Sequence, residues 1–181
     1  TTDYVDINGN IVRGAPIEEI PSKSVSCLEF AVDPRWTYTP YYLLGGPNFN
    51  IYAAFAAGGQ LSSIFSVSQA HKGIKMSFAL ALLDGWDGEE VYVKADEKVV
   101  YSVSNTWSDQ NYDKMNWGWP DSTIVPVFGF NHTGNLLSLE IGSTLDQPPE
   151  DESLGICDIT ITLTDNYVDA NGNEIANVEQ I

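Results

Sequence analysis

The sequence has few basic residues, few histidines and cysteines, and no long apolar run. Its 181 residues include only 8 lysines and arginines against 25 aspartates and glutamates, and the formal net charge is -17. A nucleic-acid partner requires basic residues that neutralise phosphates, so this balance argues against one. No apolar stretch approaches the roughly 20 residues of a membrane-spanning helix, and no signal peptide is evident, so we expect no membrane insertion.

The motifs of common catalytic centres are missing as well. The two histidines, His71 and His132, lie in no HExxH pattern and in no Cys/His spacing that binds zinc. The sequence contains no G-x-S-x-G nucleophile elbow and no phosphate-binding loop. Carboxylate pairs for glycoside hydrolysis could be drawn from so many acids that no pair stands out. We therefore expect a protein that is not an enzyme.

Apolar and aromatic residues are abundant, at 43% and 12% of the chain. This content argues against disorder, and the length fits one domain with a sizeable core. Two cysteines, Cys27 and Cys157, lie in the first and last strong strand candidates. A disulfide and two buried thiols both fit the sequence, and we favour thiols because a core of this size needs no covalent link.

The stretch from Gly73 to Ser104 combines an apolar run, an acidic segment and two β-branched runs. The run Ile74 to Leu83 predicts a buried strand, although periodicity alone also allows a helix. The β-branched residues on either side of Ala95-Asp-Glu-Lys98 predict a hairpin.

The acidic segment Asp84-Gly-Trp-Asp-Gly-Glu89 holds three carboxylates and two glycines in six residues. Clustered oxygen ligands in a glycine-turned loop suit calcium, and an exposed polar turn is the alternative. Calcium takes about six to eight oxygens, which no single loop supplies, so we expect several loops at one end of the molecule to share the site. The candidate ligands of the calcium ion are Asp84, Asp87, Glu89, Asp146, Asp151, Glu152 and Asp158.

The remainder of the chain consists of short strand candidates separated by turns. Several short strands with Gly, Pro and Asn turns predict an all-β fold, a β-sandwich of jelly-roll or lectin-like type with long loops at one end. The segment Gln60 to Ala70 fits a strand or one short helix, and Trp36 to Asn48 and Ser143 to Gly155 are expected to be loops. The other expected strands are Ser24–Val32, Asn50–Ala57, Thr123–Phe130, Leu136–Ile141 and Ile156–Leu163.

The segment Asn105 to Ser122 is a long, aromatic-rich loop. Aromatic side chains offer a large rigid contact area, so the loop could form a ligand-recognition surface. The alternative is that its tryptophans cover the sheet as part of the core. The candidate ligand-binding residues are Trp86, Trp107, Tyr112, Trp117, Trp119 and Asp121.

The two ends of the chain repeat each other: Tyr4-Val-Asp-Ile-Asn-Gly-Asn10 returns as Tyr167-Val-Asp-Ala-Asn-Gly-Asn173. An Asn-Gly pair between β-forming residues predicts a hairpin turn. Two similar hairpins are the simple interpretation. We favour a junction at each copy: residues 1–15 and 167–181 join neighbouring modules of a longer chain, and residues 16–166 form the binding module.

Several motifs occur together: Leu83 to Glu89 with its hairpin, Gly118-Trp-Pro-Asp121, Phe128 to Thr133, Leu139 to Asp146, and Asp151-Glu-Ser-Leu-Gly-Ile156. Together they resemble the calcium-dependent peptide-binding domain of large RTX adhesins, over about residues 20 to 164. Gly85 and Leu154 depart from the pattern of that family. The resemblance implies a β-sandwich with calcium at one end that holds the C-terminal carboxylate of a partner peptide. It also implies a secreted adhesin of the bacterial cell surface that acts in adhesion and biofilms.

The resemblance and the residues together lead to three candidate functions, of which the first is what the resemblance implies. The first is an adhesion module that binds, through calcium, the peptide C-termini of host or neighbouring-cell surface proteins. The second is a calcium-dependent, lectin-like module that binds glycans through their hydroxyl groups. The third is a spacer that calcium stiffens, with contacts only to neighbouring modules of the same chain.

Overall fold

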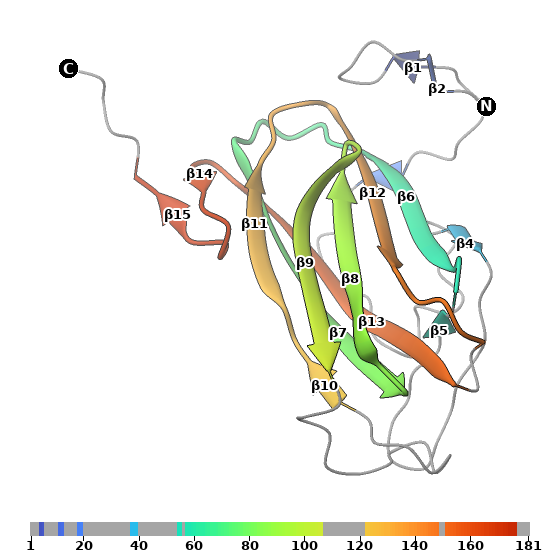
Figure 1. Ribbon diagram of the computed structural model, residues 1–181. Helices are drawn as coiled ribbons and strands as arrows, with labels where there is room; N and C mark the ends of the chain where they lie inside the picture. The colour runs from blue at the N-terminus through green and yellow to red at the C-terminus, as the bar shows by residue number, and fades with distance from the viewer. Residues whose placement is uncertain are drawn as a thin grey trace.

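The computed structural model describes residues 57–106, 122–148 and 151–176, and short strands at 4–5, 11–12, 18–19, 37–39 and 54–55. Within these ranges every regular element is a β-strand (Figure 1), which confirms the predicted all-β sandwich. No helix of the described residues is long and apolar enough to cross a membrane.

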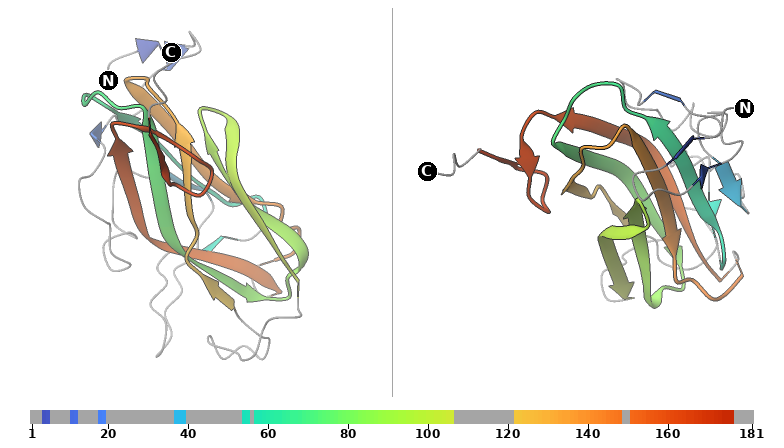
Figure 2. Two further views of the ribbon diagram at one scale, coloured as in Figure 1. Left: turned by 90° about the vertical axis from the view of Figure 1, so that its left-hand side faces the viewer. Right: turned by 90° about the horizontal axis from the view of Figure 1, so that it is seen from above.

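The described strands form two main sheets that face each other as the layers of a sandwich (Figure 2). The first sheet has the order β10-β7-β13-β5, with β11 also paired to β7. Its strands are β5 (Ala54–Phe55), β7 (Gly73–Asp84), β10 (Ser122–Ile124), β11 (Val127–Asn131) and β13 (Glu152–Thr164). The second sheet has the order β3-β6-β12-β8-β9, with β4 also paired to β6. Its strands are β3 (Glu18–Glu19), β4 (Thr37–Thr39), β6 (Gln60–Ser66), β8 (Asp87–Ala95), β9 (Lys98–Thr106) and β12 (Leu136–Ser143).

The hydrophobic core lies between the two sheets. Phe78 and Leu80 of β7 are buried in the same cluster as Phe65 of β6, Val93 of β8 and Leu139 of β12. Strand β6 shows the strict alternation of burial expected of a half-buried strand. Burial of apolar side chains from both layers therefore holds the sandwich together.

Strand β7 confirms the strand predicted at Ile74 to Leu83. It pairs antiparallel with β13 from Gly73 opposite Thr164 to Asp84 opposite Glu152, with a shift in register between Cys157 and Thr160. Strand β13 begins four residues before the predicted Ile156, so part of the expected loop from Ser143 to Gly155 is strand. Because of this longer pairing, the acidic residues at the start of β13 lie beside the end of β7.

The predicted hairpin is confirmed by β8 and β9. Its turn residues Asp96 and Glu97 both have positive φ, 48° and 66°, as a type I′ turn requires. The turn is fixed to β12, because the Asp96 amide donates to the Ser138 carbonyl and the Ser138 amide donates to Asp96 Oδ1.

Other strand predictions are corrected in detail. The strand expected over Thr123–Phe130 is two strands, because Pro126 between them has no amide to donate to a ladder. The segment from Gln60 is a strand rather than a helix, and it ends at Ser66. The expected loop from Trp36 contains the edge strand β4, which pairs with β6. Within the strand predicted at Asn50–Ala57, the structure describes Ala54–Phe55 as strand. The strand predicted at Ser24–Val32 lies outside the described residues. Cys27 and the Cys157 side chain lie outside them as well.

The repeated motifs at the two ends form hairpins of the same register. Strand β1 (Tyr4–Val5) pairs with β2 (Ile11–Val12), with Tyr4 opposite Val12. Strand β14 (Tyr167–Val168) pairs with β15 (Glu174–Ile175), with Tyr167 opposite Ile175. The hairpin predicted from the Asn-Gly pair is therefore confirmed at both ends by the pairing of its strands, and the turn itself is described in the C-terminal copy.

Both histidines are buried in a network near the hairpin turn. Their rings stack, with His71 Nε2 2.7 Å from His132 Nδ1. His71 Nδ1 lies 2.8 Å from the Gln69 carbonyl, and His132 Nε2 lies 2.9 Å from the Leu136 carbonyl. These contacts tie the two loops that carry the histidines to each other.

Candidate metal centre

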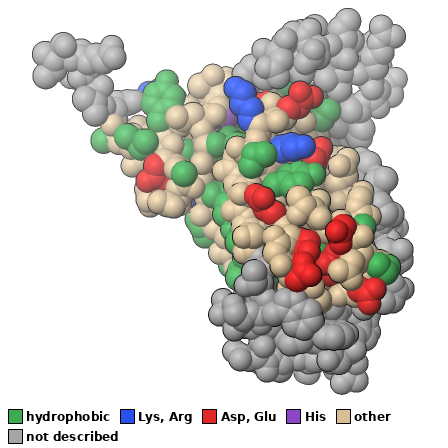
Figure 3. All heavy atoms as spheres, in the orientation of Figure 1, with side chains coloured by type: hydrophobic (Ala, Val, Ile, Leu, Met, Phe, Trp, Pro, Cys, Tyr) green, Lys and Arg blue, Asp and Glu red, His purple; other side chains and the backbone are tan. Residues whose placement is uncertain are grey.

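The acidic segment lies at the end of the sandwich where β7 ends and where β8 and β13 begin. The connection from β7 to β8 is only Gly85 and Trp86, shorter than the predicted loop from Asp84 to Glu89. The Gly85 amide donates to the Asp151 carbonyl at 2.7 Å, which joins this connection to the start of β13. Acidic side chains gather toward this end of the face shown in Figure 3.

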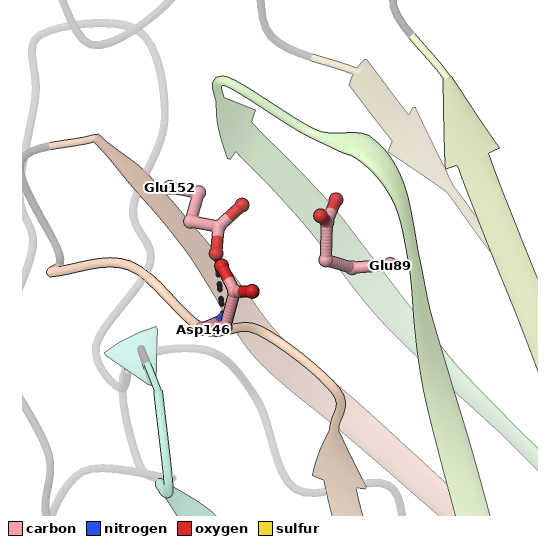
Figure 4. A group of neighbouring side chains, drawn as sticks. All are labelled: Glu89, Asp146 and Glu152. Carbon is pink, nitrogen blue, oxygen red and sulfur yellow. Dashed lines mark hydrogen bonds between the residues drawn. The ribbon is translucent and has the colours of Figure 1, made fainter.

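Three carboxylates from different segments converge here (Figure 4): Glu89 of β8, Asp146 of the loop after β12, and Glu152 at the start of β13. One oxygen of each lies within 4.8 Å of the other two. Two hydrogen bonds bring the segments together, because the Glu90 amide donates to Thr144 Oγ1 at 2.8 Å and the Thr144 amide donates to the Glu90 carbonyl at 2.9 Å.

Glu152 is the central residue of this cluster. Its side chain is fully buried, and its Oε1 accepts hydrogen bonds from the amides of Asp146 and Gln147, each at 2.8 Å. Its other oxygen, Oε2, is buried and has no hydrogen-bond partner among the described residues. Burial raises the pKa of Glu152, the two amide hydrogen bonds oppose this, and the negative charges of Glu89 and Asp146 raise it further. A buried carboxylate with one free oxygen is costly unless a cation or a proton compensates it.

Glu89 is held by the residues just before it. Its Oε2 accepts from the amides of Asp87, at 2.7 Å, and Gly88, at 3.1 Å. Gly88 has a φ of 137°, a value that residues with a side chain rarely adopt. Burial acts to raise the pKa of Glu89, but hydrogen bonds from the Asp87 side chain and from the backbone amides of residues 87–89 outweigh it, and the pKa is lowered. The hydrogen bond to Glu89 and the negative charge of Glu89 raise the pKa of Asp87.

The donor set suits a hard divalent cation. Calcium binds oxygens at about 2.3–2.6 Å, so two oxygens on opposite sides of one ion lie about 5 Å apart. The three carboxylate oxygens are within that reach. The unpaired Oε2 of Glu152 is a buried acceptor, and the charged neighbours that raise the pKa of Glu152 are both negative. A calcium ion at this position would satisfy the free oxygen and relieve the repulsion, so the residues fit the metal.

The structure brings together three of the seven predicted metal ligands. Asp87 is exposed and contacts the cluster through Glu89. Asp151 is exposed, and its backbone carbonyl, not its carboxylate, has a described contact with Gly85. Asp84 and Asp158 lie in β7 and β13, but their side chains are outside the described residues.

The predicted ligand-binding role of Trp86 is corrected. Its ring is fully buried in the core, and its indole nitrogen donates to the Ser153 carbonyl at 2.9 Å. The short connection between β7 and β8 folds this side chain inward, so the ring has no surface for a ligand. The other predicted ligand-binding residues lie outside the described residues: Trp107, Tyr112, Trp117, Trp119 and Asp121.

Sequence reasoning did not single out Thr144 or the amides of Asp146 and Gln147. Thr144 aligns the loop after β12 with β8, and the two amides fix the orientation of the Glu152 carboxylate. No side-chain pattern marks these backbone groups, because they are positioned by the turn between β12 and β13.

The sequence matches no protein-family model and no curated protein. Among solved structures, dimeric latent PorU from Porphyromonas gingivalis matches with a TM-score of 0.50 and 12% identity, over 92% of this chain. This chain spans only 15% of that PorU chain. At this identity the similarity concerns the fold alone.

Two carbohydrate-binding modules match with lower TM-scores. A CBM36 module in complex with calcium and xylotriose has a TM-score of 0.43 and 13% identity, over 70% of this chain and 98% of the module. A family 6 carbohydrate-binding module has a TM-score of 0.47 and 10% identity, over 83% of this chain and all of that module. With TM-scores below 0.5, these matches say nothing about a ligand of this chain.

Proposed function

We propose that this chain is a non-catalytic binding module that holds a calcium ion at Glu89, Asp146 and Glu152 and uses it to bind the hydroxyl groups of a carbohydrate. The observation that carries the proposal is that Glu152 is fully buried with one free oxygen, while one oxygen of its carboxylate lies within 4.8 Å of an oxygen of both Glu89 and Asp146. An acid with a purely structural role is expected to be exposed to water or to have a hydrogen-bond partner for each oxygen. Glu152 Oε2 is buried and has no such partner among the described residues.

The number of carboxylates favours a neutral ligand. Three carboxylates exceed the two positive charges of a calcium ion, so the occupied site keeps a net negative charge. An anionic peptide terminus would approach against this charge, whereas sugar hydroxyls would fill the open coordination positions without that repulsion.

Binding of peptide C-termini, which the resemblance to RTX adhesins implies, is the second candidate. It would apply if residues outside the described ranges supply positive charge or further contacts to the ligand. An extracellular location on a bacterial surface, which the same resemblance implies, is part of this second candidate.

The proposal is tested by ligand screening with matched variants. Wild-type protein, Glu152→Gln and Glu97→Gln would be screened in calcium and in EDTA against a glycan array and against peptides with free or amidated C-termini. Glu97 is an exposed acid at the hairpin turn, so its substitution makes the same chemical change far from the cluster.

We expect glycan binding in calcium by the wild type and Glu97→Gln, and its loss in EDTA and in Glu152→Gln. Binding of free but not amidated peptides, with no glycan bound, would replace the carbohydrate proposal by the peptide one. Calcium binding without either ligand would leave the spacer function, and the absence of calcium binding would overturn the metal centre itself.

A further inference from the structure

The hairpin Tyr167–Ile175 is docked on its own sandwich beside β11. The Val168 amide donates to Asn131 Oδ1 at 3.0 Å, and the Gly129 amide donates to the Ala170 carbonyl at 3.2 Å. The Val168 side chain is buried, 4% exposed. In Figure 1 the hairpin lies next to β11, at the end of the sandwich away from the metal centre.

Glycines on the sandwich make this close approach feasible. A Cβ on Gly129 would lie 2.7 Å from the Gly172 Cα and 2.8 Å from the Asp169 carbonyl oxygen. A Cβ on Gly73 would lie 3.0 Å from Val168 Cγ2. Contacts below 3.0 Å essentially do not occur with real Cβ atoms, so a side chain at Gly129 would prevent this approach. The two glycines form a socket in which the hairpin backbone lies against Gly129 and the Val168 side chain lies against Gly73.

The hairpin motif supplies the matching shape. Asp169 Oδ1 accepts from the amides of Asn171 and Asn173, both at 2.9 Å, and Gly172 takes a φ of 79°. These bonds curl the turn so that Gly172 faces Gly129. Three residues that the two copies share therefore act in docking, because Val168 is buried, Asp169 shapes the turn and Gly172 permits the contact.

The N-terminal copy has the same residues at all of these positions. Val5, Asp6 and Gly9 correspond to Val168, Asp169 and Gly172, and the two hairpins share one pairing register. Within the nine-residue hairpins the copies differ at three positions, where Ala170, Glu174 and Ile175 replace Ile7, Ile11 and Val12. All three of these residues are exposed in the docked hairpin, so none of the differences touches a buried docking position.

We propose that the hairpin Tyr4–Val12 is the docking element for a preceding module of the same kind in the same chain. The socket of this sandwich is filled by its own C-terminal hairpin, so the N-terminal copy has to find its socket on another module. That module would carry a glycine and an asparagine at the positions of Gly129 and Asn131. One hairpin would thus end one sandwich and lead into the next.

The first test exchanges the hairpins within the full chain. The variant A170I/E174I/I175V places the N-terminal hairpin sequence in the C-terminal socket, and Gly129→Ala serves as the undocked control. We expect the triple variant to keep the melting temperature and the slow hydrogen exchange of the Gly129 amide. Gly129→Ala should lower the melting temperature by about 2–10 °C. A triple variant that is destabilised as much as Gly129→Ala would overturn the proposal.

The second test joins two modules through one hairpin. Residues 1–166 are fused directly to residues 4–181, so that Tyr4–Val12 of the second copy follows the first sandwich. We expect the Gly129 amide of the first sandwich to exchange at least about tenfold more slowly than when Val5 and Gly9 of the second copy are replaced by Asp and Ala. Equal exchange in both fusions, with the second sandwich folded, would show that the hairpin does not dock.

Discussion

Replacement of Glu152 by glutamine should change the stability of the protein by different amounts with and without calcium. Glutamine keeps the shape and the oxygen that accepts from the amides of Asp146 and Gln147. It removes the buried negative charge, and its amide group can donate to the neighbouring carboxylates. In EDTA we therefore expect the variant to be more stable than the wild type, whereas in calcium this difference should shrink, because only the wild type gains the full stabilisation from the bound ion.

The size of both effects can be worked out from the site. A buried, unsatisfied charged group costs about 1–3 kcal/mol or more, and Glu152 is fully buried, so the variant should gain about that much in EDTA. At 10 mM calcium and a dissociation constant of about 0.1–1 mM, binding stabilises the wild type by about 1.4–2.7 kcal/mol. For a domain of this size that corresponds to an increase of roughly 3–10 °C in melting temperature.

The assay is thermal or urea unfolding, followed by circular dichroism, of wild type, Glu152→Gln and Glu97→Gln. Each protein is measured in EDTA and in 10 mM calcium. The exposed Glu97→Gln control should behave as the wild type in both conditions. A wild-type melting temperature that calcium leaves unchanged, or a glutamine variant less stable than the wild type in EDTA, would refute the reasoning about the free oxygen.

Three further predictions concern pH, the histidines and Trp86. Burial and neighbouring charges raise the pKa of Glu152 from its ordinary 4.5. Without calcium, the contribution of Glu152 to the free energy of unfolding is therefore most favourable at low pH, and it is lost as the pH rises through the raised pKa. Protons and calcium compete for this group, so the calcium-induced rise in melting temperature should shrink as the pH falls from neutral toward the raised pKa of Glu152. A rise that stays constant over this range would contradict the prediction. His71→Ala leaves the Gln69 carbonyl and His132 Nδ1 without their partners, so it should lower the free energy of unfolding by about 1–3 kcal/mol in urea titrations. An unchanged free energy of unfolding would refute the histidine network. Trp86→Phe removes the donor to the Ser153 carbonyl and should lower the free energy of unfolding by about 2 kcal/mol in the same titrations. The ligand affinity of the folded protein should stay unchanged, and a loss of affinity without a loss of stability would restore the ligand-binding role of Trp86.

The fold was largely predictable because its central strands have strong local signals. The apolar run in β7 and the β-branched runs around Asp96 indicate a buried strand and a hairpin, and both form. Strand ends were less predictable, because pairing partners decide them. Strand β13 extends to Glu152 since β7 offers a partner as far as Asp84, and nothing in the local sequence of residues 152–155 requires it.

The candidate site was predictable in composition and less so in arrangement. The number of acids near Glu89 and Asp146 pointed to an oxygen-rich metal site, but not to which of them meet. Glu152 is central because the register between β7 and β13 buries it, and register is a tertiary property. The prediction for Trp86 also depended on tertiary structure. An aromatic residue in a short turn can face solvent or core, and the two-residue connection between β7 and β8 places this ring in the core.

The position of the site along β7 links the two proposals. The metal centre lies where β7 ends, at Asp84 opposite Glu152, and the hairpin socket lies where β7 begins, at Gly73 opposite Thr164. The strand has 12 residues, so these two points are roughly 36 Å apart. Within one sandwich, a hairpin docked in the socket would therefore leave the metal centre clear. A ligand could bind calcium at that end without disturbing the hairpin, and substitutions at Gly129 and at Glu152 should then change docking and calcium binding independently.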